Sequence, residues 1–347
     1  MSPLISGAIV SLRLNRYQSP TFPWLLQPSK TIPIPKDQGT AFLPQAYFQG
    51  RFLPFQDANI SVATHALHYG TGVLGGIRAL PNPSVPNQIL IFRLDAHCQR
   101  LCNSAKYLGY AIAPNALKST LIEFVRRNRP AEPFYIRPLI YTAGLGVTPR
   151  LHDIEKDLII YGIPMGDYLK KKTVRCRISS WSRQRDLSQP LRAKTTAAYI
   201  ASALAKTEAI ESGFDEAILL NSHGKISEAS AMNLFIVRQG QLITPSIDQD
   251  ILEGITRNSL LTVARDLGIS TVERPVDKSE LMIADEIFLC GTAAQMVPVA
   301  SIENYTLPEQ RLVTQQLQQR LNEIIQGENS SYDSWLTQID YGQVPQT

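Results

Sequence analysis

Short strands separated by tight turns constrain the fold of this chain more than any other feature of its sequence. Apolar runs predict strands over Glu216–Leu220 and Ile226–Glu228, on either side of a turn at Asn221–Gly224. A second turn at Gln239–Gly240 leads into a further predicted strand over Gln241–Thr244. This part of the chain is therefore predicted to be mainly strand.

Helices alternate with strands in both halves of the chain, so the predicted fold class is α/β (α+β). The other predicted elements are a hairpin over 47–53, strands over 88–93, 134–142, 158–163, 233–237 and 286–290, and helices over 95–108, 115–127, 200–212 and 255–267. A chain of 347 residues is long enough for two domains, and Pro164–Asp167 has the composition of a link. We expect an irregular N-terminal extension over 1–45, a small domain over 46–165 and a larger domain over 166–347.

A lysine just ahead of the helix predicted over 200–212 is a candidate reactive group. The helix has apolar residues close to helical spacing, at Ile200, Ala203, Leu204 and Ile210. We therefore expect that face to be buried and the pKa of Lys194, at its edge, to be lowered. A lysine with a lowered pKa can act as an amine nucleophile and can hold a carbonyl cofactor as a Schiff base.

Composition limits the kinds of binding partner and the cellular compartment that we expect for this chain. The net charge of +4 is small and its positive residues are scattered, which disfavours a nucleic-acid partner. No apolar run approaches the roughly 20 residues that a membrane helix needs. The cysteines form no CxxC pair and have no histidine cluster beside them, which disfavours a metal site and fits a reducing, cytoplasmic compartment. These cysteines are Cys98, Cys102, Cys176 and Cys290.

The N-terminal segment has no acidic residue before Asp37, a composition that weakly resembles a transit peptide. Its prolines disfavour regular structure, so we interpret it as an irregular extension.

Two glycine–threonine corners are candidates for binding a phosphate. Gly254-Ile255-Thr256 opens the helix predicted over 255–267, where backbone amides and the helix dipole favour an anion. Gly291-Thr292 follows a predicted strand and, like the first corner, offers backbone amides and a hydroxyl. On the strand over 134–142, Tyr135 and Arg137 share one face by alternation and would suit a further anion, although an ordinary structural ion pair is the commoner explanation.

Together these motifs resemble the fold type IV pyridoxal-phosphate enzymes. The motifs are Lys194 to Tyr199, Ile226 to Phe235, Gly254 to Arg257 and Gly291 to Ala294. In the first half, four further motifs resemble the branched-chain aminotransferases of that fold. They are His68 to Thr71, Gly76 to Arg78, His97 to Leu101 and Tyr135 to Leu139. The resemblance runs from about Phe48 to beyond Pro298 and implies a smaller N-terminal α/β domain and a larger C-terminal pseudo-barrel domain.

The resemblance implies that pyridoxal 5'-phosphate is the cofactor and assigns the residues that bind it. Lys194 would bind the cofactor covalently and then carry the proton between the substrate and the cofactor. Glu228 would pair with the pyridine nitrogen, and Tyr199 would donate to the phenolic oxygen. The phosphate would be held by Arg100, Ile255, Thr256 and Thr292.

The same resemblance implies how the substrate binds. Tyr135, with the backbone amides of Thr292 and Ala293, would bind the α-carboxylate. The distal carboxylate of glutamate would be received by Arg137, Tyr69 and Arg78. The implied reaction is transamination of L-leucine, L-isoleucine and L-valine with 2-oxoglutarate, in branched-chain amino acid biosynthesis, by a homodimer or larger homo-oligomer.

Two departures from the family pattern keep alternatives open. Leu74 and Gly75 replace a common aromatic residue and a glutamate, and we expect both changes to widen the side-chain pocket. Arg150 and His152 resemble the carboxylate trap of D-amino acid aminotransferases, although we interpret them as surface loop residues. The alternatives are therefore a D-amino acid aminotransferase, an aminodeoxychorismate lyase, or a cofactor-binding protein that has lost catalysis.

Overall fold

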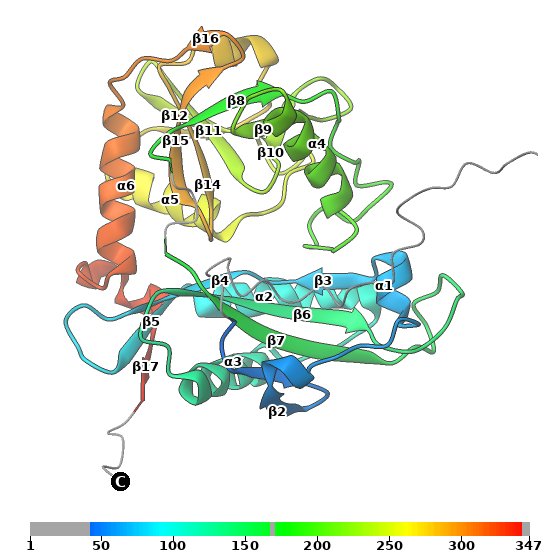
Figure 1. Cartoon of the computed structure of the whole chain (residues 1–347). Coiled ribbons are helices and arrows are strands. Elements are labelled where there is room, and N and C mark those ends of the chain that lie inside the picture. Colours follow the sequence, from blue (N-terminus) through cyan, green and yellow to red (C-terminus); the bar gives the residue numbers. More distant parts are fainter. Residues whose placement is uncertain (1–41, 167–170, 342–347) are drawn as a thin grey trace, which may run out of the picture. The chain divides into compact units, whose positions relative to one another are not determined.

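The computed structural model describes residues 42–166 and 171–341, and Figure 1 shows its elements. The predicted N-terminal extension lies outside the described residues as far as residue 41, as does Asp167 of the predicted link. None of the helices in the described ranges is both long and apolar enough to cross a membrane.

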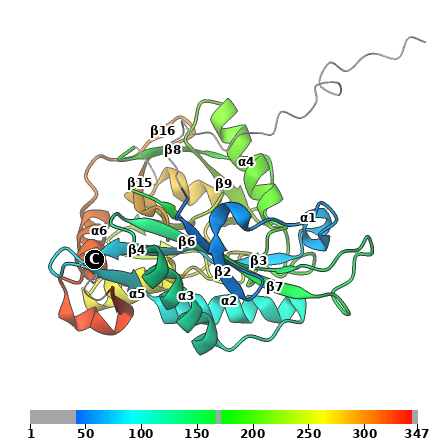
Figure 2. The ribbon, with the colours of Figure 1, turned by 60° about the horizontal axis from the view of Figure 1, so that its bottom comes forward.

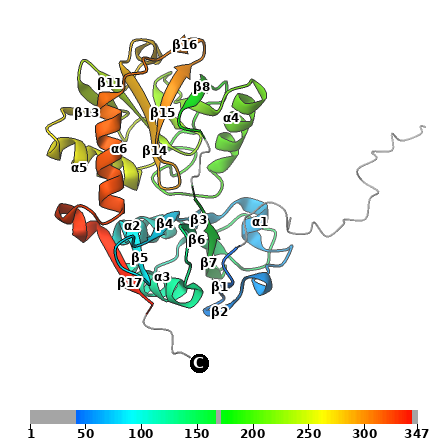
Figure 3. The same cartoon turned by 60° about the vertical axis from the view of Figure 1, so that its left-hand side comes forward.

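An antiparallel sheet forms the first part of the fold. Its strands are β1 (Gln45–Phe48), β2 (Arg51–Pro54), β3 (Gly72–Leu74), β4 (Ile77–Pro81), β5 (Gln88–Phe92), β6 (Phe134–Thr142), β7 (Lys156–Pro164) and β17 (Leu336–Asp340). The order across the sheet is β17-β5-β4-β6-β7-β1-β2, and β3 pairs with β6. The last strand of the chain therefore returns to the first sheet, where it pairs with β5 (Figure 3).

Helices cover one face of this sheet. The covering helices are α2 (Leu94–Ala105) and α3 (Pro114–Asn128), with the 3-10 turn η2 (Lys106–Leu108). Helix α1 (His65–Tyr69) and the 3-10 turn η1 (Phe55–Asp57) belong to the same part of the chain. Leu101 of α2 and Leu121 of α3 are buried in one core with Ile136 of β6. Pro114 starts α3 with its backbone angle already helical, and Arg129 ends it in the left-handed conformation. Figure 2 shows α2 and α3 below the sheet.

A second, mixed sheet carries most of the remaining chain. Its strands are β8 (Val174–Ile178), β9 (Glu216–Leu220), β10 (Ile226–Ala229), β11 (Asn233–Arg238), β12 (Gln241–Thr244), β13 (Thr271–Glu273), β14 (Glu286–Gly291), β15 (Gln295–Ile302) and β16 (Tyr305–Thr306). The order is β10-β9-β8-β15-β14-β11-β12-β13, and β16 pairs with β15. The accompanying helices are α4 (Tyr199–Glu211), α5 (Ile255–Asp266) and α6 (Leu312–Ile325), with 3-10 turns η3 (Lys278–Met282) and η4 (Ser330–Trp335).

Helix α4 buries a different face from the one predicted. Ile200 and Ile210 are 63% and 54% exposed, whereas Ala201, Ala205 and Ala209 are buried. Ala205 and Ala209 pack with Ala217 and Leu219 of β9 in a small cluster. Side chains this small allow the helix axis to approach the strand closely, and the larger residues are left on the outer side. The prediction that Ile200, Ala203, Leu204 and Ile210 form the buried face was therefore wrong.

Candidate active site

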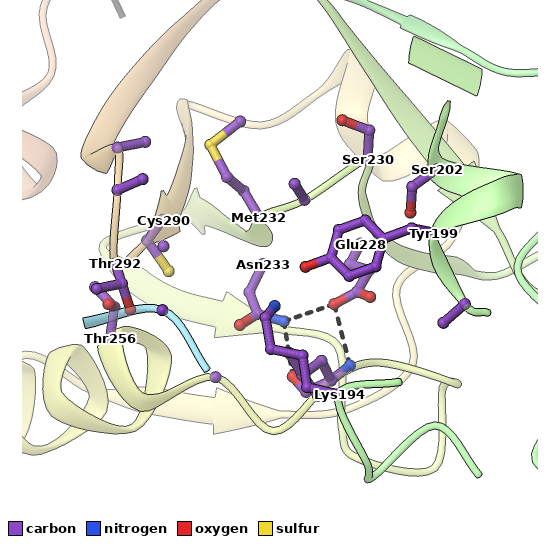
Figure 4. A pocket seen from close by; sticks show the side chains of 18 of the residues that line it. Lys194, Tyr199, Ser202, Glu228, Ser230, Met232, Asn233, Thr256, Cys290 and Thr292 are labelled. Atoms are coloured by element: carbon purple, nitrogen blue, oxygen red, sulfur yellow. Dashed lines mark hydrogen bonds between the residues drawn. The ribbon is translucent and has the colours of Figure 1, made fainter. Parts of the chain in front are cut away.

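A cavity of about 440 Å³ is lined by residues from both sheets and from α2, α4 and α5. The predicted site residues that line it are Arg100, Tyr135, Arg137, Lys194, Tyr199, Glu228, Ile255, Thr256, Thr292 and Ala293. Figure 4 shows several of them converging on this space from separate elements. No group of His, Cys, Asp and Glu residues in the described ranges could hold a metal ion.

Two predicted site residues do not line this cavity. Arg78 lies on β4, and its guanidinium donates to the carbonyl oxygens of Ala293 (2.9 Å) and Gly166 (3.1 Å). It thus braces the segment that carries Ala293 without itself lining the cavity. Tyr69 ends α1, and its hydroxyl donates to the carbonyl oxygen of Val147 in the loop between β6 and β7. The roles predicted for both residues stay predictions.

The backbone of Lys194 is held by elements of the first sheet. The Leu74 N–H donates to the Lys194 carbonyl oxygen (2.9 Å), and Thr195 forms an isolated bridge with Val73 of β3. The Lys194 N–H donates to the Ser104 hydroxyl of α2 (3.2 Å). Both backbone groups of Lys194 are therefore fixed, and its side chain enters the cavity from a rigid support.

The Lys194 amine has the lowered pKa that its sequence context predicted. Burial, followed by repulsion from the Arg100 guanidinium, lowers the pKa of this amine to about 7. Its Nζ atom lies 5.4 Å from the centre of the Tyr199 ring. The burying surface is the cavity wall and not the apolar face of α4 that the sequence indicated. At neutral pH a large fraction of this amine is unprotonated and nucleophilic.

Glu228 lies on β10 and is held by three donors. Its Oε1 atom is 2.7 Å from the Arg183 guanidinium, and its Oε2 atom accepts from the Asn233 amide (2.9 Å) and the Leu252 N–H (3.1 Å). Burial raises the pKa of Glu228, and the charge of Arg183 is the largest influence that opposes the rise. The pair with Arg183 thus favours the ionised carboxylate, which can balance a cation bound beside it.

Arg183 and Asn233 are site residues that sequence reasoning missed. Arg183 follows β8, far from Glu228 along the chain, so no short pattern pairs the two residues. Asn233 was predicted as the first residue of a strand and lies inside the motif Ile226 to Phe235, but it was given no role in the site. The available signal was a polar side chain at the start of an otherwise apolar strand, where burial requires it to find a hydrogen-bond partner.

The N-terminus of α5 forms another wall of the cavity. Gly254 caps the helix with an extended backbone, and Ile255 and Thr256 form the first turn, whose N–H groups have no partner within the helix. Arg100 reaches the same segment and donates to the Glu253 carbonyl oxygen (3.2 Å). Amides, a hydroxyl and a guanidinium therefore gather where the helix dipole favours an anion.

Tyr135 and Arg137 lie close together on β6. The Arg137 guanidinium donates to the Tyr135 hydroxyl oxygen (3.2 Å), and burial raises the pKa of Tyr135. The hydroxyl therefore stays protonated and can donate to an anion. A Cβ atom at Gly76 would lie 1.9 Å from this oxygen. Only glycine at position 76 leaves the Tyr135 hydroxyl in its place.

The expected widening of the pocket at Gly75 was wrong. A Cβ atom at Gly75 would lie 2.7 Å from Cγ of Pro138, so this position faces β6. Leu74 is buried and does not line the cavity either. Arg150 and His152 are exposed in the loop between β6 and β7, and neither lines the cavity.

Comparison with known proteins places these features in a family. The family model described as Amino-transferase class IV matches residues 85–302. A Synechocystis sp. protein named "Probable branched-chain-amino-acid aminotransferase" is 58% identical over 298 residues, which cover 86% of this chain and 98% of that protein. The chain therefore belongs to the class IV aminotransferase family.

Solved structures agree with this assignment. The branched-chain aminotransferase from Thermoproteus uzoniensis with norvaline has a TM-score of 0.81 and 37% identity, covering 86% of this chain and all of that one (100%). The branched-chain amino acid aminotransferase from Thermobaculum terrenum in its PLP-form (holo-form) has a TM-score of 0.81 and 33% identity, covering 86% and 99% of the two chains. These likenesses confirm the predicted α/β fold of fold type IV enzymes.

Proposed function

We propose that this chain transfers the amino group of L-leucine, L-isoleucine and L-valine to 2-oxoglutarate, with pyridoxal 5'-phosphate as its cofactor. The observation that carries the proposal is the arrangement of three groups around one cavity. An amine with a pKa of about 7 (Lys194), an ion-paired carboxylate (Glu228) and the N-terminus of α5 all line it. The names of the similar proteins support the same reaction.

The residues present fit this cofactor. It has an aldehyde, a protonatable ring nitrogen and a phosphate, and the cavity offers an amine for the first, a carboxylate for the second and an anion site for the third. The close packing of Gly254 against Asn233, where a Cβ atom would lie 1.9 Å from the amide oxygen, keeps the wall at this end compact. Lys194, Tyr199, Glu228, Arg100, Ile255, Thr256 and Thr292 would hold the cofactor.

The protein supplies binding, orientation and proton transfer. When bound, the cofactor withdraws electrons from the substrate α-carbon. Lys194 Nζ would take the proton from that carbon and would carry it between the substrate and the cofactor. Glu228, whose ionised form Arg183 favours, would hold a proton on the ring nitrogen. Tyr199 donates a hydrogen bond to the phenolic oxygen.

The substrate carboxylate is bound by Tyr135 and by the backbone amides of Thr292 and Ala293. Arg137 supports Tyr135 and, with Tyr69 and Arg78, receives the distal carboxylate of glutamate. The Tyr135–Arg137 pair lines the cavity, whereas Arg150 is exposed and does not, which favours this L-type arrangement over a D-type trap at Arg150.

We further propose that the working form is a homodimer or a larger homo-oligomer in the cytoplasm. Strongly exposed apolar side chains include Val62, just before α1 (84%), and Val147, in the loop between β6 and β7 (82%). A partner subunit would cover them. The free, buried cysteines fit a reducing compartment. The division into domains at residue 165 stays part of this proposal.

Isotope transfer tests the proposed function. The purified protein, loaded with pyridoxal 5'-phosphate, is incubated with ¹⁵N-labelled L-leucine and 2-oxoglutarate. We expect ¹⁵N-labelled L-glutamate and 4-methyl-2-oxopentanoate in equal amounts, measured by mass spectrometry. The absence of ¹⁵N-labelled glutamate, with the cofactor bound, would contradict the proposal.

A further inference from the structure

One buried amide joins two walls of the cavity. Asn233 begins β11 and is 6% exposed. Its side-chain nitrogen donates to Glu228 Oε2 (2.9 Å) and to the Leu252 carbonyl oxygen (3.0 Å). Figure 4 shows the side chain directed toward Glu228, with these bonds as dashed lines. Both hydrogens of the amide are therefore used.

The loop before α5 completes the connection. The Leu252 N–H donates to the same Glu228 oxygen (3.1 Å). The backbone of Leu252 therefore contacts both residues, because its N–H donates to Glu228 and its carbonyl oxygen accepts from Asn233. On the other side, Gly254 packs against the amide oxygen of Asn233, where a Cβ atom would lie at 1.9 Å. Gly254 caps α5 with φ −71° and ψ 135°, angles that any residue adopts. Glycine is therefore needed at position 254 for contact with Asn233 and not for backbone conformation.

We propose that Asn233 is a positioning residue that fixes the distance between Glu228 and the N-terminus of α5. The inference rests on the proposed function, in which these groups bind the ring nitrogen and the phosphate of one rigid cofactor. A ligand held at both ends binds well only when the two sites have the right separation. Asn233 touches both sites and contributes no charge of its own, so its effect is on geometry.

The proposal distinguishes two ligands by their affinity. Pyridoxal 5'-phosphate must contact both Glu228 and the N-terminus of α5. Pyridoxal lacks the phosphate, so of these two sites it depends on Glu228 alone. Asn233→Ala should therefore lower the affinity for pyridoxal 5'-phosphate by about tenfold or more, the size expected for losing a hydrogen bond to a charged group. It should lower the affinity for pyridoxal by a clearly smaller factor. The affinities are measured by fluorescence titration of the apo-protein, so catalysis is not the readout.

Gly254→Ala tests the same contact from the other side. Its methyl group displaces the Asn233 amide, so this variant should also lose affinity for pyridoxal 5'-phosphate more than for pyridoxal. The Asn233→Ala background lacks this amide. Adding Gly254→Ala to it should therefore lower the affinity for pyridoxal 5'-phosphate much less than Gly254→Ala does in the wild type. This non-additivity is specific to the contact, and Gly254→Ala carries the test if Asn233→Ala does not fold.

Asn221→Ala is the matched control. Asn221 is also a buried asparagine of this sheet region, bonded through its amide to Gln249 (3.0 Å), and it does not line the cavity. Its loss should lower thermal stability and leave the ratio of the two affinities unchanged. Equal losses for both ligands in Asn233→Ala, or additive effects of the two substitutions, would overturn the inference. Wild-type protein that binds no pyridoxal 5'-phosphate would instead contradict the proposed function.

Discussion

The guanidinium of Arg183 lies 2.7 Å from Oε1 of Glu228, and the two side chains are only 7% and 8% exposed. Burial alone raises the pKa of a carboxyl group, because the charged form loses its hydration. Arg183 opposes that rise and favours the ionised form of Glu228. The two residues therefore act as one unit, in which the arginine maintains the charge that the carboxylate presents to the cavity.

Replacing Arg183 should make catalysis depend on pH. In Arg183→Gln the pKa of Glu228 is raised further, so the carboxylate is protonated over more of the neutral range. The activity of the variant should be low near neutral pH and should recover as the pH rises through the new pKa. The pH profile of kcat measures this effect. In a second variant, Arg183→Ala, added guanidinium should restore part of the activity.

The control variant is Arg175→Gln, because Arg175 is an exposed arginine on β8. A pH profile of Arg183→Gln equal to that of the control would contradict the role assigned to Arg183.

Replacing Glu228 should separate binding from chemistry. Glu228→Gln keeps the shape of the side chain and, through its amide oxygen, can still accept the hydrogen bond from Asn233, but it removes the charge. We expect pyridoxal 5'-phosphate to remain bound and the transamination rate to fall by orders of magnitude, because the ring nitrogen is no longer kept protonated. Single-turnover kinetics measure the loss. Near-normal rates would show that another group provides the charge.

Lys194 should be the residue that borohydride links to the cofactor. Lys194→Ala should abolish turnover and labelling while the protein stays folded. Lys206 is the informative control, because it also lines the cavity but is paired with Glu216 (2.8 Å). Lys206→Ala should still be labelled, and peptide mass spectrometry identifies the site. Labelled Lys206 in the wild type would refute this assignment.

The lowered pKa of Lys194 also predicts how capture of the cofactor depends on pH. Only the unprotonated amine attacks an aldehyde, and burial favours that form. The capture rate of the apo-protein should therefore rise with pH and level off above about 7, well below the ordinary lysine value of 10.5. Stopped-flow absorbance measures the rate. A rate that kept rising toward 10.5 would show that the amine is solvated.

Local sequence patterns predicted the elements whose structure is decided by neighbours along the chain. The strand predicted over 134–142 coincides with β6, and the hairpin predicted over 47–53 corresponds to β1 and β2. Strands that depend on distant partners were missed. Thus β15 lies between β8 and β14, and β17 pairs with β5. These strands are stabilised by pairing and burial against distant parts of the chain, which the local pattern of apolar residues does not reveal.

The candidate site shows the same division. Motifs located Lys194 and Glu228, and the structure brings both to one cavity. Arg183 escaped notice because its partner is distant in sequence. The alanine face of α4 was missed because a pattern of hydrophobicity gives weight to large residues, whereas close packing against β9 requires small ones.

The α-carboxylate site should decide the handedness of the substrate. A hydrogen bond to a charged group is worth about 1.5–3 kcal/mol, so Tyr135→Phe should lower kcat/KM for L-leucine by roughly tenfold or more. Arg150→Ala removes an exposed loop residue and should change L-leucine kinetics little. Steady-state kinetics of both variants provide the check. The opposite order of effects would place the carboxylate at Arg150.

An amino-donor panel tests the central claim most directly. The wild-type protein, loaded with pyridoxal 5'-phosphate, is given L-leucine, L-isoleucine, L-valine, D-alanine and D-glutamate separately. The L-amino acids are paired with 2-oxoglutarate and each D-amino acid with a 2-oxo acid that it does not itself generate. We predict rapid transfer from the three L-amino acids and poor transfer from both D-amino acids. Brisk turnover of D-alanine that is lost in Arg150→Ala would contradict the branched-chain assignment and leave the cofactor assignment standing.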